Sequence, residues 1–150
     1  MTTSQQIALA LAILAGLLVY LQVLSMLIAW WSGWRALAAQ FHHDFDFRNQ
    51  IGGWQSARMR WGCHYNNALK IAVDDQGLSL ATIAIVPRHP PMLIPWNQVA
   101  FVGRSKFFSW TFVTFNLGFT QHIPFAVSEN LARQIQSAPG APPHLIPKNE

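Results

Sequence analysis

The chain has 150 residues, of which 51% are hydrophobic and only 11% charged, and its formal net charge at pH 7 is +4. Its basic residues are scattered, which argues against nucleic-acid binding because that function needs a dense basic surface. The single cysteine, Cys63, excludes an internal disulfide and is typical of a reducing compartment.

The first 34 residues contain no Lys, Arg, Asp or Glu, and the segment from Ile7 to Trp31 is almost entirely apolar. As a helix, its 25 residues would extend roughly 38 Å, enough to cross a hydrocarbon core of about 30 Å. The run is too long for a cleaved signal peptide, and it follows an uncharged N-terminus. We therefore predict a transmembrane helix over about 7–31, within an N-terminal segment of residues 1–34.

Aromatic and basic residues follow the apolar run. Trp30, Trp31 and Trp34 are predicted to lie in the headgroup layer, which indole rings favour, and Arg35 can extend back to the phosphates. No basic residue precedes the helix, whereas four arginines lie within the 26 residues that follow Trp34. The positive-inside rule therefore predicts that the C-terminal domain is cytoplasmic.

Small residues recur on one face of the predicted helix, at Ala8, Ala12 and Gly16. Such a stripe allows a second helix to approach closely, and Gln22 adds an amide that is costly in lipid without a partner. Two interpretations remain open. The stripe either packs against another helix, from a partner or a second copy, or it faces lipid and the helix is a tether that tolerates Gln22.

Residues 35–53 are predicted to form a juxtamembrane helix and a polar connector. Apolar residues at helical spacing from Trp34 to Phe41 indicate that the helix continues from Ser32 to about Gln40. The segment His42–Asp46 holds the densest group of potential metal ligands, but adjacent side chains diverge and the spacing matches no metal motif. We therefore predict no metal site here.

From Trp54 to Pro124 the hydrophobic pattern has a period of two, which is typical of strands with one buried face. Turn signals such as Asp74–Gly77 divide the region into seven strands. The predicted strands are 54–61, 68–73, 78–86, 92–95, about 97–104, 107–116 and 118–124. Ser128 is placed to cap a helix over 129–136, and the prolines from Pro139 onward predict a disordered tail over 138–150.

The predicted fold class is α+β, mainly β, with the C-terminal helix plugging a seven-stranded antiparallel barrel over residues 54–137. This order of elements resembles a pleckstrin-homology-like (PH-like) domain. The segment His89–Val99, with Ile94-Pro95-Trp96 in its centre, resembles small bacterial inner-membrane proteins that carry one N-terminal helix and a PH-like domain. The resemblance extends to Gly33-Trp34 with Leu37, and to Gly77-Leu78. It implies a single-pass inner-membrane protein and no activity; the positive-inside rule then predicts a periplasmic N-terminus.

The sequence contains no convincing catalytic constellation. Cys63 and His64 are neighbours, which rarely face each other, and no acid is evident to orient the histidine. The acid pairs Asp44/Asp46 and Asp74/Asp75 fall in a predicted loop and a predicted turn. We therefore predict that the protein is not an enzyme and uses no cofactor.

Two functions from different classes remain. The first is a membrane-anchored cytoplasmic binding module, an adaptor or accessory subunit that holds a membrane-protein or cytoplasmic partner. The alternative is a peripheral reader of anionic lipid headgroups through Arg58, Arg60 and Lys70 on the first two strands, each contributing roughly 1 kcal/mol near the surface. These three residues depart from the order found in lipid-binding PH domains, and they equally suit a solvated strand face.

Overall fold

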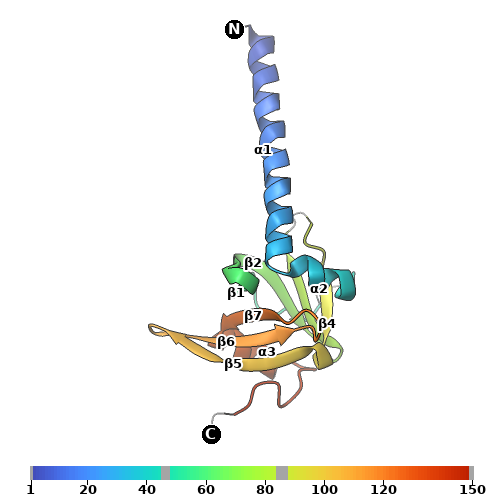
Figure 1. The fold of residues 1–150 in the computed structure, drawn as a ribbon, viewed down its shortest axis with the longest axis vertical. Coiled ribbons are helices and arrows are strands. Elements are labelled where there is room, and N and C mark those ends of the chain that lie inside the picture. The colour runs from blue at the N-terminus through green and yellow to red at the C-terminus, as the bar shows by residue number, and fades with distance from the viewer. Residues whose placement is uncertain (1, 45–47, 84–87, 149–150) are drawn as a thin grey trace.

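The computed structural model describes residues 2–44, 48–83 and 88–148 of the chain. Its N-terminal helix, α1 (Thr3–Trp31), is long and apolar enough to cross a membrane, and it projects from the remaining elements over most of its length (Figure 1). The buried residues of α1 are Ser25 and Ala29, both near its C-terminal end. The helix therefore meets the rest of the protein only over its last two turns.

The helical pattern continues after Trp31, but in a separate helix. Gly33 adopts a left-handed conformation with a φ of +85°, which ends α1 and turns the chain. α2 (Trp34–Phe41) then runs across the end of the β domain rather than along α1 (Figure 1), and it buries Leu37 and Ala38 against the core. The predicted continuation through Ser32 is therefore interrupted, because only a residue without a Cβ fits comfortably at Gly33.

Seven antiparallel strands form one sheet in the order β4-β3-β2-β1-β7-β6-β5. The strands are β1 (Gln55–Arg58), β2 (His64–Val73), β3 (Gly77–Thr82), β4 (Met92–Pro95), β5 (Val99–Phe107), β6 (Trp110–Leu117) and β7 (Ile123–Ser128). Two short 3-10 turns, η1 (Arg60–Gly62) and η2 (Trp96–Gln98), precede β2 and β5. β4 and β5 form the two edges of the sheet, which curls into a half-barrel (Figure 1).

The predicted number of strands is confirmed, and β4 has the predicted bounds. The first strand is shorter than predicted because η1 interrupts it, and β2 already begins at His64. β7 begins at Ile123, since Gly118, with a φ of +76°, turns the chain where the seventh strand was expected. The predicted third strand extends into 84–86, which lies outside the described residues.

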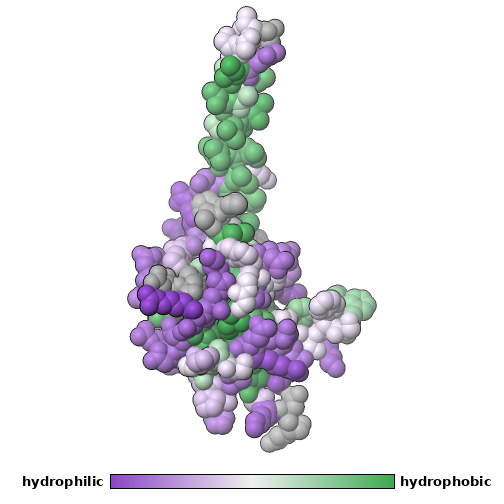
Figure 2. Space-filling view, turned by 180° about the vertical axis from the view of Figure 1, so that it is seen from behind, coloured by the Kyte–Doolittle hydropathy of each residue, from purple (hydrophilic) through white to green (hydrophobic). Residues whose placement is uncertain are grey.

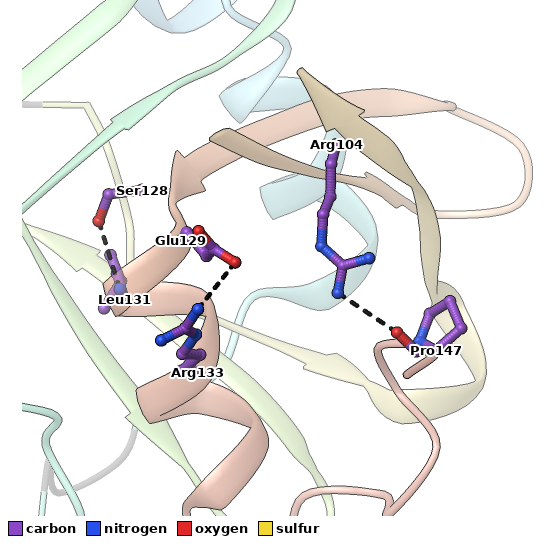
Figure 3. Close-up of polar contacts among 6 residues, drawn as sticks. All are labelled: Arg104, Ser128, Glu129, Leu131, Arg133 and Pro147. Atoms are coloured by element: carbon purple, nitrogen blue, oxygen red, sulfur yellow. Dashed lines mark hydrogen bonds and ion pairs between the residues drawn. The ribbon is translucent and has the colours of Figure 1, made fainter. Parts of the chain in front are cut away.

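The half-barrel encloses the core, and α3 (Glu129–Ser137) covers it with Leu131, Ala132 and Ile135. The Ser128 hydroxyl accepts a hydrogen bond from the Leu131 amide at 3.3 Å, which is the predicted helix cap. On the outer face of α3, Arg133 and Glu129 pair at 3.0 Å (Figure 3). The predicted helix and its buried face are therefore confirmed.

Residues 138–148 pack against the domain, whereas the sequence predicted a disordered tail. Leu145 is buried, and the Gln136 side chain donates to the carbonyl of Pro142 at 2.9 Å and accepts from the amide of Ile146 at 2.8 Å. Arg104 on β5 donates to the carbonyl of Pro147 (Figure 3). One glutamine thus satisfies backbone groups at two points of the tail, which proline content does not reveal.

Candidate functional site

The predicted helix-packing residues of the anchor all lie exposed on α1. Ala8, Ala12, Gly16 and Gln22 are all exposed, and a Cβ added at Gly16 would meet no atom within 4 Å. The stripe is therefore available to lipid or to another helix. The structure leaves both interpretations open.

The residues predicted for the membrane interface separate into two groups. Trp30 and Trp31 are 60% and 52% exposed at the end of α1, and Arg35 is exposed on α2. Trp34, in contrast, is fully buried in the domain, where its indole Nε1 donates to the carbonyl of Pro90 at 3.1 Å. The predicted interfacial position of Trp34 is wrong because the turn at Gly33 directs α2 into the core.

The basic residues of the first two strands do not converge on one ligand. The Arg60 guanidinium donates to the carbonyls of Trp31 and Trp30 at 3.1 and 3.0 Å, and so binds the C-terminal end of α1. Arg58 lies over the Phe112 ring at 5.6 Å, and Lys70 lies over the Trp54 ring at 4.9 Å. These separate contacts do not form a phosphate clamp.

A chain of buried polar groups joins the anchor to the β domain. Ser25 of α1 lies 3.4 Å from Nδ1 of His89, whose Nε2 lies 3.0 Å from the Tyr65 hydroxyl. That hydroxyl lies 2.9 Å from Oγ of Ser32, which in turn accepts from the Trp34 amide. All five residues are at most 6% exposed. Buried polar groups are costly unless they are paired, so this network favours one arrangement of helix and domain.

Burial also perturbs the Tyr65 phenol. Desolvation raises the pKa of Tyr65 to about 12, although the hydrogen bond with Ser32 lowers it in part. The phenol is therefore protonated at neutral pH and has a proton to donate, either to His89 or to Ser32. In the first case Ser32 can donate to the Tyr65 oxygen, which gives every member of the chain a partner.

Three aromatic side chains gather at the tip of the β5–β6 hairpin. Phe107, Phe108 and Trp110 are 65%, 88% and 65% exposed. The hairpin projects sideways from the domain, away from the axis of α1 (Figure 1), and Figure 2 shows its tip as a protruding group of hydrophobic and weakly polar residues. Phe108 has a φ of +55°, a conformation that bulky residues rarely adopt. Exposed aromatic side chains of this density are typical of an interaction surface.

A groove of about 780 Å³ lies beside this tip; we call it the aromatic groove. Phe107, Trp110 and Phe112 line it from the hairpin, and the polar groups opposite belong to β1 and the start of β2, namely Gln55, Ser56, Arg58, His64, Asn66 and Asn67. Arg58 and Ala126 form the one residue pair between β1 and β7. Residues of both strands line the groove, Gln55–Arg58 from β1 and Ala126–Ser128 from β7.

The described residues that line the aromatic groove carry positive charge and no negative charge. Of the described residues that line it, Arg58 is the one with a permanent charge, and none is an acid. The groove therefore combines apolar walls, amide groups that can donate and accept hydrogen bonds, and one cation. Such a lining suits an extended chain with apolar and acidic side chains.

The residues examined for catalysis or metal binding are not brought together. No group of three or more His, Cys, Asp or Glu able to hold a metal occurs in the part of the chain that the structure describes, which excludes Asp46. His42 contacts the carbonyl of Pro91. Desolvation raises the pKa of the Cys63 thiol despite the nearby Arg60 charge, which disfavours a nucleophilic thiolate.

Sequence reasoning missed the hairpin tip and Trp61. The sequence predicts one strand over 107–116, although the adjacent aromatic residues at 107 and 108 cannot face the same side of a strand. Trp61 was assigned to the buried face together with Ala57 and Met59. Those two are buried, but Trp61 is 74% exposed, because η1 turns the chain after Met59. The following Gly62 was the available signal for that turn.

Comparison with known proteins adds no family to these observations. No family model matches the chain, and no curated protein matches it either.

Proposed function

We propose that this protein is a membrane-anchored binding module, an adaptor or accessory subunit of a membrane protein complex. In this proposal α1 spans the bacterial inner membrane and the β domain lies in the cytoplasm. The half-barrel covered by one C-terminal helix supports a PH-like assignment, since PH-like domains share that order of elements. The proposed role is non-catalytic.

The observation that carries the proposal is the exposed aromatic tip beside the aromatic groove. Burying an aromatic side chain removes about 150–250 Å² of surface from water, and each such side chain contributes roughly 1.5–3 kcal/mol when fully buried. Phe108 and Trp110 leave most of this free energy unused in the isolated chain. A partner that covers both would gain the kind of aromatic anchor that dominates protein interfaces.

The occupant we propose is an extended segment of a protein partner that carries apolar and acidic side chains. The apolar residues would pack against Phe107 and Trp110, and an acidic residue would face Arg58. We favour an extended chain over a helix because residues of the strands β1, β6 and β7 line the groove, and an extended chain can lie along strand backbone. The sideways projection of the hairpin favours a protein partner over the bilayer that α1 would span.

The lipid-reading alternative has less support. It requires Arg58, Arg60 and Lys70 to act together on one headgroup, but each makes a different contact. Arg60 in particular already binds the end of α1. A partner helix at the Ala8–Gly16 stripe would be compatible with the adaptor role, as would self-association through it.

The test is to pan a random peptide library displayed on phage against the full chain in lipid nanodiscs, after subtraction on empty nanodiscs. We expect enriched peptides that combine apolar and acidic residues and whose binding weakens at high salt. Trp110→Ser should weaken them at least tenfold, a loss typical of an aromatic hot spot. Arg58→Glu should abolish binding of the acidic peptides by charge reversal.

Phe119→Ser provides the matched control, because Phe119 is also an exposed aromatic residue, at 59%, but does not line the groove. It should leave peptide binding unchanged. Enrichment of no peptide, or equal binding to all three variants, would contradict the proposed site.

A further inference from the structure

Trp61 lies beside the end of the anchor, held there by η1. Its ring centroid is 6.4 Å from that of Trp31, and the preceding Arg60 donates to the carbonyls of Trp31 and Trp30. η1 lies next to the last turn of α1 (Figure 1). Trp61 is therefore brought to the level at which the apolar helix ends, although it belongs to the β domain.

The backbone of Trp61 is strained. Its φ and ψ are 58° and 25°, a left-handed conformation that bulky residues rarely adopt. Gly62 follows with a φ of +73°, and the Met59 amide donates to the Cys63 carbonyl at 2.8 Å across the turn. This tight turn buries Met59 and presents the Trp61 indole outward.

The exposure of Trp61 is unexplained by the fold of the domain. Its side chain is 74% exposed, so packing in the core does not offset the strain. Trp30 and Trp31 are exposed as well. The Trp31 ring contacts those of Trp30 and Trp61 edge to face, with centroids 6.4 Å apart in both pairs. Two elements far apart in sequence thus build one aromatic surface where the apolar span ends.

We propose that Trp61 is a membrane-interface residue, and that the β domain rests on the bilayer through Trp30, Trp31 and Trp61. The occupant is the headgroup layer itself, because it adjoins the end of α1 and because indole rings favour that layer. Arg60 holds Trp61 in this position by binding the C-terminal end of α1, where the helix dipole is negative. The proposal rests on α1 spanning the membrane, as in the proposed function, but not on the aromatic groove.

The experiment uses the full chain, labelled with fluorotryptophan, in nanodiscs of phosphatidylethanolamine and phosphatidylglycerol. Single Trp→Phe substitutions assign the resonances of the seven tryptophans. Lipids with a nitroxide at the headgroup should broaden the resonances of Trp30, Trp31 and Trp61 several-fold more than that of Trp110. Trp110 is the reference because it is 65% exposed at the hairpin tip, which projects away from α1. Broadening of Trp61 no greater than that of Trp110 would overturn the proposal.

A second variant separates membrane contact from folding. Trp61→Gly relieves the left-handed strain, so the β domain should be at least as stable as in the wild type. Loss of the indole should nevertheless let the domain rotate more freely relative to the bilayer. A fluorine label on Cys63 should report this freedom, because the nitroxide lipids should broaden its resonance less than in the wild type. A marked loss of stability in Trp61→Gly would instead indicate a structural role and contradict the proposal.

Discussion

The hydroxyl of Tyr65 lies 3.0 Å from Nε2 of His89, at the centre of the hydrogen-bond chain between α1 and the β domain. The Trp34 and His89 rings pack with centroids 5.2 Å apart, and those of Trp34 and Tyr65 are 5.7 Å apart. These contacts connect residues from α1, α2, β2 and the β3–β4 loop. The joint between anchor and domain is therefore a packed core region and not a flexible linker.

Tyr65 should make stability depend on pH at the alkaline end. Its folded pKa of about 12 lies above the ordinary value of 10.0, so its contribution is fully present below pH 10 and is lost as pH rises from 10 through 12. A shift of this size corresponds to on the order of 2 kcal/mol. Tyr65→Phe should remove this step from a plot of unfolding free energy against pH.

Absorbance of the tyrosinate band checks the same shift directly. The chain has two tyrosines, so the difference between wild type and Tyr65→Phe isolates the Tyr65 titration. A midpoint near pH 10 in the folded protein would contradict the burial of this phenol.

Gly33→Ala should destabilise the protein. A Cβ at Gly33 would lie 2.5 Å from Cδ1 of Ile123, and the φ of +85° adds strain for any L side chain. We expect a loss of about 1–2 kcal/mol, seen as a fall in Tm of roughly 4–16 °C. Gly53→Ala is the control, because a Cβ there meets nothing within 4 Å. Equal Tm values for the two variants would show that the turn at Gly33 tolerates a side chain.

Gly16→Leu should reduce association of the anchor if α1 packs against another helix. The substitution separates the backbones and removes the close van der Waals contact that drives association in lipid. Leu17→Ile, one residue away, should have little effect. The measurement is cross-linking between copies, or co-purification of a partner, at equal membrane insertion. If neither variant changes association, α1 is a tether.

The domain after α1 is predicted to be cytoplasmic, because arginines follow the helix and no basic residue precedes it. A C-terminal fluorescent-protein fusion should be bright, and the matching alkaline-phosphatase fusion should be inactive. The opposite pair of results would reverse the orientation.

The elements that sequence predicted well are those governed by local patterns. The apolar run of α1, the period of two in the strands and the Ser128 cap each depend on neighbouring residues, and each is present. The break at Gly33 was missed because helical spacing continues on both sides of it. The aromatic groove is not predictable from local patterns either, since its lining residues come from β1, β2, the β5–β6 hairpin and β7, which are distant in sequence.

The joint has a mechanical consequence. A helix that spans a bilayer adjusts its tilt to the local hydrocarbon thickness. Here α1 is held to the domain by Arg60 and by the Ser25–His89–Tyr65–Ser32 chain, so a change of tilt must turn the whole half-barrel with it. The hairpin tip projects to one side of that axis, so it would rise or fall relative to the lipid surface. The height at which Phe108 and Trp110 meet a partner would then follow the thickness of the surrounding membrane.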